Sequence, residues 1–223
     1  MSEKSSLSIR LTCVAQHIAP TDLVIDVGSD HGQLSAYCLD HHVTPFVIAT
    51  DIHKAPALRT ESYLKAMGYE KQSKTFCTDG LSGIELKPRT TVVIAGMGGL
   101  EIRDILSDVM KERDLFAYDD LRFVLQPQRS LEELRFFLAE NGFSIECESI
   151  TKDRGRFYSV IEVTYSGTPY KIDLKEAFFG PYILKEKPPF YQEFMAHERS
   201  VIEKISRGRK EWVPYLASWD EWV

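Results

Sequence analysis

The chain has 223 residues, of which 27 are Lys or Arg and 33 are Asp or Glu, so its formal net charge is −6. A general nucleic-acid-binding domain is usually basic, and this balance argues against one. The charge is uneven, because residues 1–150 carry 15 Lys and Arg against 22 Asp and Glu, whereas residues 151–223 carry 12 against 11. Any polyanionic partner is therefore expected to meet the C-terminal part or a local basic patch.

The four cysteines, Cys13, Cys38, Cys77 and Cys147, are far apart and form no CxxC pair. We interpret them as small apolar side chains in a reducing compartment, with neither disulfides nor a metal site. No segment approaches the ~20 apolar residues of a membrane span, and no apolar run follows the first charges. We therefore expect a soluble, cytoplasmic monomer.

Short apolar runs recur along the first half of the chain, with room for a helix between most of them. Their continuous apolar character is typical of strands buried on both faces of a parallel sheet. Residues 143–153 and 156–165 then flank a Gly-containing turn and predict an antiparallel hairpin. This pattern favours an α/β fold of the class I methyltransferase type, Rossmann-like, with a mostly parallel seven-stranded sheet. The apolar runs are residues 23–27, 46–50, 75–78, 91–95 and 123–126.

Helical patterns surround these strands. Apolar residues from Leu7 to Ile18 have the spacing of an amphipathic helix. Ser130 followed by Glu133 is the pattern of a capping box at the start of another helix. Prolines between residues 181 and 189 interrupt the chain before a last amphipathic helix. We predict a Rossmann-like domain over residues 1–166 and a helical appendage over residues 167–223.

The stretch "DVGSDHG" begins at Asp26, directly after the first apolar run. In a doubly wound sheet, ligands bind beyond the carboxyl ends of the strands, where the first loop lies. Gly28 would let the backbone approach a ligand, but Asp30 replaces the second glycine of a dinucleotide-binding loop. A carboxylate ~4 Å from a pyrophosphate charge costs about 4 kcal/mol at an effective dielectric constant of ~20. The loop therefore favours S-adenosyl-L-methionine (SAM), which has a sulfonium and an ammonium group and no phosphate.

Two further acids follow the next two apolar runs. Asp51 lies 19 positions after Gly32, close to the ~20-residue offset at which a carboxylate binds ribose hydroxyls. Asp79, followed by Gly80, lies where methyltransferases often place an acid against the adenine amino group. One such Asp is often only a turn former, but acids at three successive strand ends predict a SAM site. The glycines of "AGMGG", residues 95–99, favour close backbone approach at the next strand end.

The order and spacing of five segments resemble the bacterial tRNA (adenine-22 N1)-methyltransferases, the TrmK family. These segments are "LSIRLTCVAQHI", "DVGSDHGQL", "IAGMGG", "LQPQ" and "GRFYSVIEV". The resemblance implies a SAM-dependent enzyme whose C-terminal helical part helps to hold tRNA. It implies a cofactor site formed by Asp26, Gly28, Asp51, Asp79, Gly80 and Gly96. It places Asp30, His31 and Met97 against the target adenine.

The chain departs from the family pattern in two places. After "GSDH" the family usually continues with Ala-Tyr-Leu-Pro, whereas this chain has Gly32-Gln33-Leu34-Ser35 and so lacks an aromatic residue there. The C-terminal part is also short. Both departures concern the recognition of tRNA more than the chemistry.

Methyl transfer to N1 of adenine needs no prior proton removal, because the neutral ring has an in-plane lone pair on N1. Positive charge moves onto the purine, and a fixed carboxylate beside it would stabilise that charge. We assign this role to Asp30, with the backbone of residues 96–99 completing the pocket wall. His31 either holds Asp30, contacts a phosphate or has a structural role at a helix start.

Contacts to RNA are expected from basic residues outside this site. "SRGRK", residues 206–210, followed by Trp212, is the best candidate for phosphate contact and base stacking. A solvated helix end that favours cations explains this segment equally well. The first helix and the hairpin can also border the cleft. The candidate RNA-binding residues are Arg10, Arg154, Arg156, Arg207, Arg209 and Lys210.

Three other functions remain open at this point. One is a methyltransferase that acts on a small molecule or a protein, in which case RNA would not compete for activity. Another is an RNA-binding module that retains SAM without turnover. The third, which the sequence favours least, is a NAD-dependent oxidoreductase. Comparing the thermal stabilisation by SAM with that by NAD distinguishes it from the other two.

Overall fold

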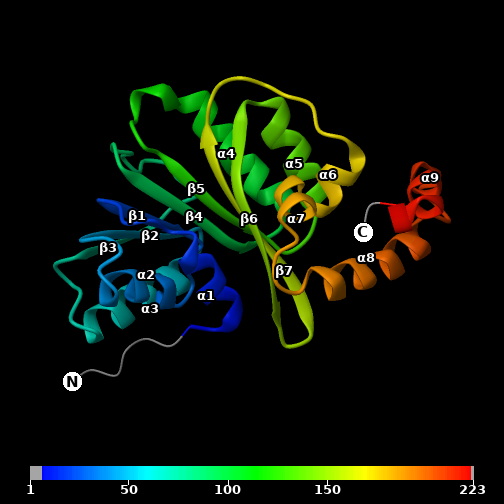
Figure 1. Ribbon diagram of the computed structural model, residues 1–223. Helices are drawn as coiled ribbons and strands as arrows, with labels where there is room; N and C mark the ends of the chain where they lie inside the picture. The colour runs from blue at the N-terminus through cyan, green and yellow to red at the C-terminus, as the bar shows by residue number, and fades with distance from the viewer. Residues whose placement is uncertain (1–6, 222–223) are drawn as a thin grey trace.

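The computed structural model describes residues 7–221, and these form a seven-stranded sheet covered by helices (Figure 1). The strand order is β3-β2-β1-β4-β5-β7-β6, with the first five strands parallel and β7 antiparallel to both of its neighbours. The predicted class I methyltransferase fold with its terminal hairpin is confirmed. The strands are β1 (Leu23–Val27), β2 (Val47–Asp51), β3 (Ser73–Cys77), β4 (Thr90–Met97), β5 (Arg122–Pro127), β6 (Phe143–Asp153) and β7 (Arg156–Tyr165).

Helices cover both faces of this sheet. Figure 1 shows α1, α2 and α3 on one side of the strands and α4 and α5 on the other, while α8 and α9 extend away from the sheet. No helix within residues 7–221 has the length and apolar character needed to cross a membrane. The helices are α1 (Ile9–Gln16), α2 (Gln33–Asp40), α3 (Lys54–Ala66), α4 (Gly99–Glu112), α5 (Leu131–Glu140), α6 (Leu174–Phe179), α7 (Pro181–Glu186), α8 (Tyr191–Ile205) and α9 (Val213–Ala217).

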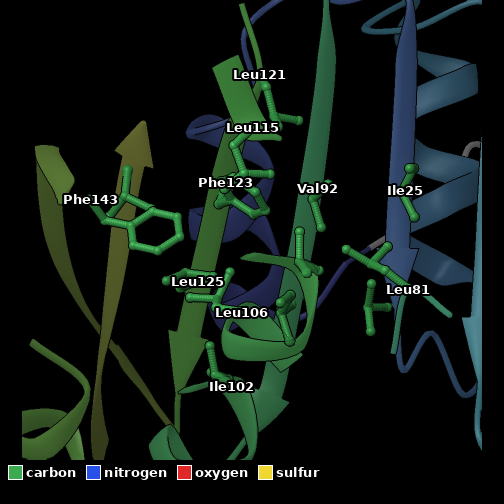
Figure 2. Close-up of a cluster of buried hydrophobic side chains, with 14 of the residues drawn as sticks. Ile25, Leu81, Val92, Ile102, Leu106, Leu115, Leu121, Phe123, Leu125 and Phe143 are labelled. Atoms are coloured by element: carbon green, nitrogen blue, oxygen red, sulfur yellow. The ribbon is translucent and has the colours of Figure 1, made fainter. Parts of the chain in front are cut away.

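The core has one layer on each face of the sheet. Figure 2 shows the layer beneath α4, where Ile102 and Leu106 of the helix meet Val92 of β4 and Leu125 of β5. On the opposite face, Val24 and its neighbours on the central strands pack against α1 and α2. Every residue of β1 is buried, which explains why its sequence is apolar, apart from Asp26, instead of alternating. Full burial of each Leu, Val or Ile side chain of this strand stabilises the fold by roughly 1.5 to 3 kcal/mol.

Two local predictions are wrong. Ser130 does not cap α5, because its backbone is left-handed at φ 54° and its hydroxyl makes no capping hydrogen bond. The backbone at Arg129 and Ser130 instead packs on the start of α4, where Gly99 donates its N–H to the Arg129 carbonyl. An N-cap residue needs extended backbone, and this contact excludes that conformation at Ser130.

The second wrong prediction concerns two of the cysteines. Cys77 and Cys147 are exposed rather than apolar packing groups, since they lie on the two edge strands, β3 and β6.

The C-terminal helices pack on the β6–β7 hairpin around a third apolar cluster, which includes Phe179, Met195 and Trp212. The predicted division between residues 166 and 167 falls in the segment between β7 and α6.

A buried ion pair joins this C-terminal part to the sheet. Arg135 of α5 donates to the Glu148 carboxylate on β6 at 2.7 Å, and both side chains are fully buried. Arg135 also donates to the carbonyls of Ala177 and Phe178, and Glu148 accepts the N–H of Tyr182. The pair therefore connects the end of α6 and the start of α7 to the central sheet.

Replacing Arg135 with alanine is expected to lower the free energy of unfolding by about 3 to 5 kcal/mol, because the Glu148 charge would stay buried without its partner. Lys65→Ala is the matched control, since it removes a cation from the exposed pair with Glu70 and should cost less than about 1 kcal/mol. Urea denaturation measures both. Equal losses in the two variants would contradict the structural role of the buried pair.

Candidate active site

A cavity of about 580 Å³, here called the main cavity, opens beyond the carboxyl ends of β1, β2 and β3. Gly28, Asp51 and Asp79 line it from successive strand ends, and Met97 lines it from the end of β4. The strand order reverses beside β1, and this is where a doubly wound sheet binds its ligand. The structure thus gathers residues that the sequence separates by as many as 69 positions.

A smaller cavity of about 250 Å³, here called the side cavity, adjoins the main cavity. The two share Gly28 and Asp30, while Asp26, Arg10 and Gly96 line the side cavity alone. Asp30 therefore lies where the two spaces meet.

Glycine is required at position 28 for two reasons. Its backbone is left-handed, with φ at 72°, and a Cβ there would overlap with the methyl group of Met97. Gly96 also has positive φ, at 84°, and lies in an irregularity of the β4–β5 ladder. The Arg10 guanidinium lies above it, 3.5 Å from the place a Cβ would take. The glycines of both motifs thus bring other side chains close to the backbone.

Asp26 is a buried carboxyl group at the border of the side cavity. The Ser35 hydroxyl donates a 2.7 Å hydrogen bond to it. Burial raises the pKa of Asp26 to about 6, and the hydrogen bonds from Ser35 offset only part of that rise. A cation placed beside this carboxyl would favour its ionised form.

Asp51 and Asp79 lie on one edge of the sheet because β2 and β3 end in register, with Asp51 opposite Cys77. The Asp51 carboxylate is buried and accepts the N–H of His53 at 2.9 Å, which fixes its orientation. Asp79 is exposed beside Gly80, whose positive φ of 52° turns the chain toward α4. Both carboxylates face the main cavity.

Asp30 is half-exposed and has left-handed backbone, with φ at 43°. One of its oxygens is 2.5 Å from an Arg59 nitrogen of α3, and the other is 3.4 Å from the His31 ring. The His31 side chain is exposed, and its contact with Asp30 is an ion pair only when the ring is protonated. Arg59 was missed by the sequence analysis, because no local pattern indicates which residue of a following helix faces a loop 29 positions earlier.

Three predicted RNA-binding arginines come from neighbouring parts of the structure. Arg10 donates to the buried Gln126 side chain at 2.5 Å, and its guanidinium is 5.9 Å from the centre of the Tyr158 ring. Its backbone N–H donates to Asp153 at the end of β6, beside the exposed Arg154 and Arg156 of the hairpin turn. The start of α1 and the hairpin turn thus adjoin at one end of the side cavity.

The C-terminal candidates differ from one another. Arg207 and Lys210 are exposed, whereas Arg209 forms a two-point ion pair with Glu132 of α5 at 2.8 and 2.9 Å and a third contact with Glu211. Trp212 is fully buried against Phe178. The expectation that Trp212 stacks on a base is therefore wrong, because the C-terminal helices use this ring to fill their own core.

The electrostatics of the main cavity limit what it can hold. Besides Asp30, Asp51 and Asp79, the α4 side contributes Glu101, Asp104 and Asp108. Four of these six carboxylates are paired with nearby cations, but no Lys or Arg is among the residues that line the cavity, so the lining still offers a pyrophosphate no cationic partner and fits a ligand with cationic groups and ribose hydroxyls, as SAM has. Among the described side chains, no group of three or more His, Cys, Asp or Glu residues could hold a metal ion.

Comparison with known proteins shows the family of this chain. The model of a methyltransferase domain family matches residues 7–161. The chain is 27% identical over 213 residues to the tRNA (adenine(22)-N(1))-methyltransferase of Bacillus subtilis, covering 91% of this chain and 87% of that one. The crystal structure of B. subtilis TrmK, an m1A22 tRNA methyltransferase, superposes with a TM-score of 0.77 at 27% identity, covering 97% of both chains.

A Streptococcus pneumoniae protein, Sp1610, crystallised in complex with SAM, has a TM-score of 0.84 at 27% identity and covers 97% of this chain and 99% of its own. The chain is therefore a class I methyltransferase that uses SAM as its cofactor. Within that class it belongs to the TrmK-like tRNA m1A22 methyltransferase family.

The raised pKa of Asp26 predicts a pH-dependent stability. Because the folded-state pKa of about 6 exceeds the ordinary value of 3.8, the folded protein binds this proton more tightly than the unfolded chain does. The contribution of Asp26 to stability therefore falls as pH rises from about 4 to about 6, by roughly 3 kcal/mol in total. Asp26→Asn removes this effect.

Urea denaturation of both proteins between pH 4 and 8 measures this effect. The free energy of unfolding of Asp26→Asn should rise relative to that of the original chain up to about pH 6, and the difference should stay constant at higher pH. A constant difference across this range would show that Asp26 does not titrate there.

Proposed function

We propose that this protein transfers the methyl group of SAM to N1 of an adenine in tRNA, at position 22 as in its B. subtilis relative. The observation that supports this most is the junction of the two cavities at Asp30. Carboxylates surround the main cavity, whereas Arg10 lines the side cavity and is joined through Asp153 to the hairpin end that carries Arg154 and Arg156. That division suits a cationic cofactor on one side and an RNA substrate on the other.

In this proposal the main cavity binds the cofactor. Asp51, fixed by the His53 N–H, accepts hydrogen bonds from the ribose hydroxyls, and Asp79 accepts one from the adenine amino group. Gly28 and Gly80 leave room for it, and its cationic end reaches the junction at Gly28, where Asp26 and Gly96 border it from the side cavity. SAM, when bound, supplies an electrophilic methyl group on a sulfonium.

The target adenine enters the side cavity in this scheme. Its N1 lone pair attacks directly, so no residue has to remove a proton. The Asp30 carboxylate stabilises the positive charge that develops on the ring, and His31 holds that carboxylate at 3.4 Å. Met97, whose methyl group lies over Gly28, provides an apolar surface on the main-cavity side of this junction.

The target base must leave any base pair before it can react, at a cost of a few kcal/mol. Contacts to the surrounding RNA offset that cost. Arg10, Arg154 and Arg156 provide phosphate contacts beside the side cavity in this proposal, and Arg207 and Lys210 provide them farther away. Arg209 takes part through the ion pairs that hold this segment on α5.

The direct test is transfer of labelled methyl from SAM to unmodified bacterial tRNA, followed by nucleoside digestion and mass analysis. We expect 1-methyladenosine, mapped to position 22. Transfer to proteins or small molecules but not to tRNA would reject the proposal in favour of another substrate class. Binding of SAM and tRNA with no transfer to any acceptor would indicate an RNA-binding module.

Asp30→Asn is expected to lower kcat for tRNA methylation by about 10² to 10³ while SAM affinity stays unchanged, because it removes only the charge beside the acceptor. Asparagine is preferred to alanine here because it tolerates the left-handed backbone at this position. Asp22→Asn is the control, since Asp22 forms an exposed ion pair with Arg89 at the opposite end of β1. Near-normal turnover in Asp30→Asn would contradict the charge-stabilising role assigned to Asp30.

A further inference from the structure

The ion pair between Asp30 and Arg59 conflicts with a free role for that carboxylate. Arg59 contacts one Asp30 oxygen at 2.5 Å and His31 lies 3.4 Å from the other. A carboxylate paired with a guanidinium has much of its charge neutralised and offers little to a cation that develops on a base. If Asp30 acts on the adenine, Arg59 has to move away from it first.

The pair is built so that it can open at little cost. Its side chains are 50% and 53% exposed, and an ion pair in such a setting contributes little to stability. The position of α3 does not depend on it, because Thr60 of α3 is hydrogen-bonded to Ser29 at 3.1 Å and packs beside Gly32. Arg59 can therefore change partner while the helix stays on the loop.

An RNA strand at this site offers Arg59 an alternative partner. The α4 side of the main cavity carries Glu101, Asp104 and Asp108, and each of these carboxylates is paired with a cation that does not line the cavity. Helix α3 carries the exposed Lys54 and Arg59 outside the cavity lining, with Arg59 reaching Asp30 at its border. A guanidinium can bind a phosphate through two hydrogen bonds, so a phosphate beside the target nucleotide competes well for Arg59.

We propose that Arg59 exchanges partners when tRNA binds: it pairs with Asp30 in the free enzyme and with an RNA phosphate in the complex. The exchange releases the Asp30 carboxylate only when an RNA strand lies across α3. This inference rests on the proposed tRNA substrate and adds a phosphate contact and a means of substrate discrimination to it.

The first test is the salt dependence of tRNA binding to the full chain, from the slope of log Kd against log salt concentration. Arg59→Gln is expected to weaken binding and to reduce the slope by about 1, as the loss of one phosphate contact does. Lys65→Gln is the matched control, because Lys65 is on the same helix and also pairs with an exposed carboxylate, Glu70. Its slope should equal that of the original chain.

The second test separates exchange from a fixed pair. Asp30→Asn frees Arg59 in advance, so tRNA binding should tighten by up to about fivefold. That gain in affinity should disappear when Arg59→Gln is also present. If Asp30→Asn instead tightened binding only by removing repulsion between the carboxylate and the RNA phosphates, the gain would persist in the double variant. The four proteins form a double-mutant cycle that needs no methyl transfer.

Each other outcome overturns the exchange. An unchanged salt slope in Arg59→Gln, with slower turnover, would make Arg59 a fixed positioning residue for Asp30. A reduced slope without tighter binding in Asp30→Asn would mean that Arg59 meets phosphate without leaving its carboxylate. Failure of the original chain to bind or methylate tRNA would reject the proposed function itself, and the exchange with it.

Discussion

The whole site depends on the burial of β1 between β2 and β4. Pairing of Val27 with Thr50 of β2 and Ile94 of β4 brings the carboxyl ends of three strands to one edge. Because the strand order reverses beside β1, the loops that follow separate there and leave space above the sheet. The apolar layers on both faces hold this edge in place, so cavity and core are two results of the same packing.

One consequence is a carboxyl group where the core would favour an apolar one. Asp26 is the fourth residue of the buried strand, and burial raises the pKa of its carboxyl group. Ser35 supplies a hydrogen bond but no charge. A cationic ligand would supply the missing charge, so the same feature that weakens the fold at neutral pH strengthens the binding of such a ligand. Selection for function rather than stability explains an acid at this position.

The second consequence concerns Asp30, which lies outside the buried edge and is held by charge instead of packing. Arg59 and His31 contact it from two sides, and both contacts are accessible to solvent. Interactions of this kind are weak and salt-sensitive, so they suit a group that must change its surroundings when a substrate arrives. The rigid part of the site thus lies on the side of the cofactor and the adaptable part on the side where we propose that RNA binds.

The sequence by itself determined the strands to within about two residues, the hairpin, and the edge on which Asp51 and Asp79 meet. It could do so because these features follow from local periodicity and from the rule that parallel strands share their carboxyl ends. Only the tertiary structure decided that Ser130 is no cap, that Trp212 is buried and that Arg59 holds Asp30. Each of these depends on contacts between segments far apart in the chain, and such contacts override local preferences without leaving a local pattern.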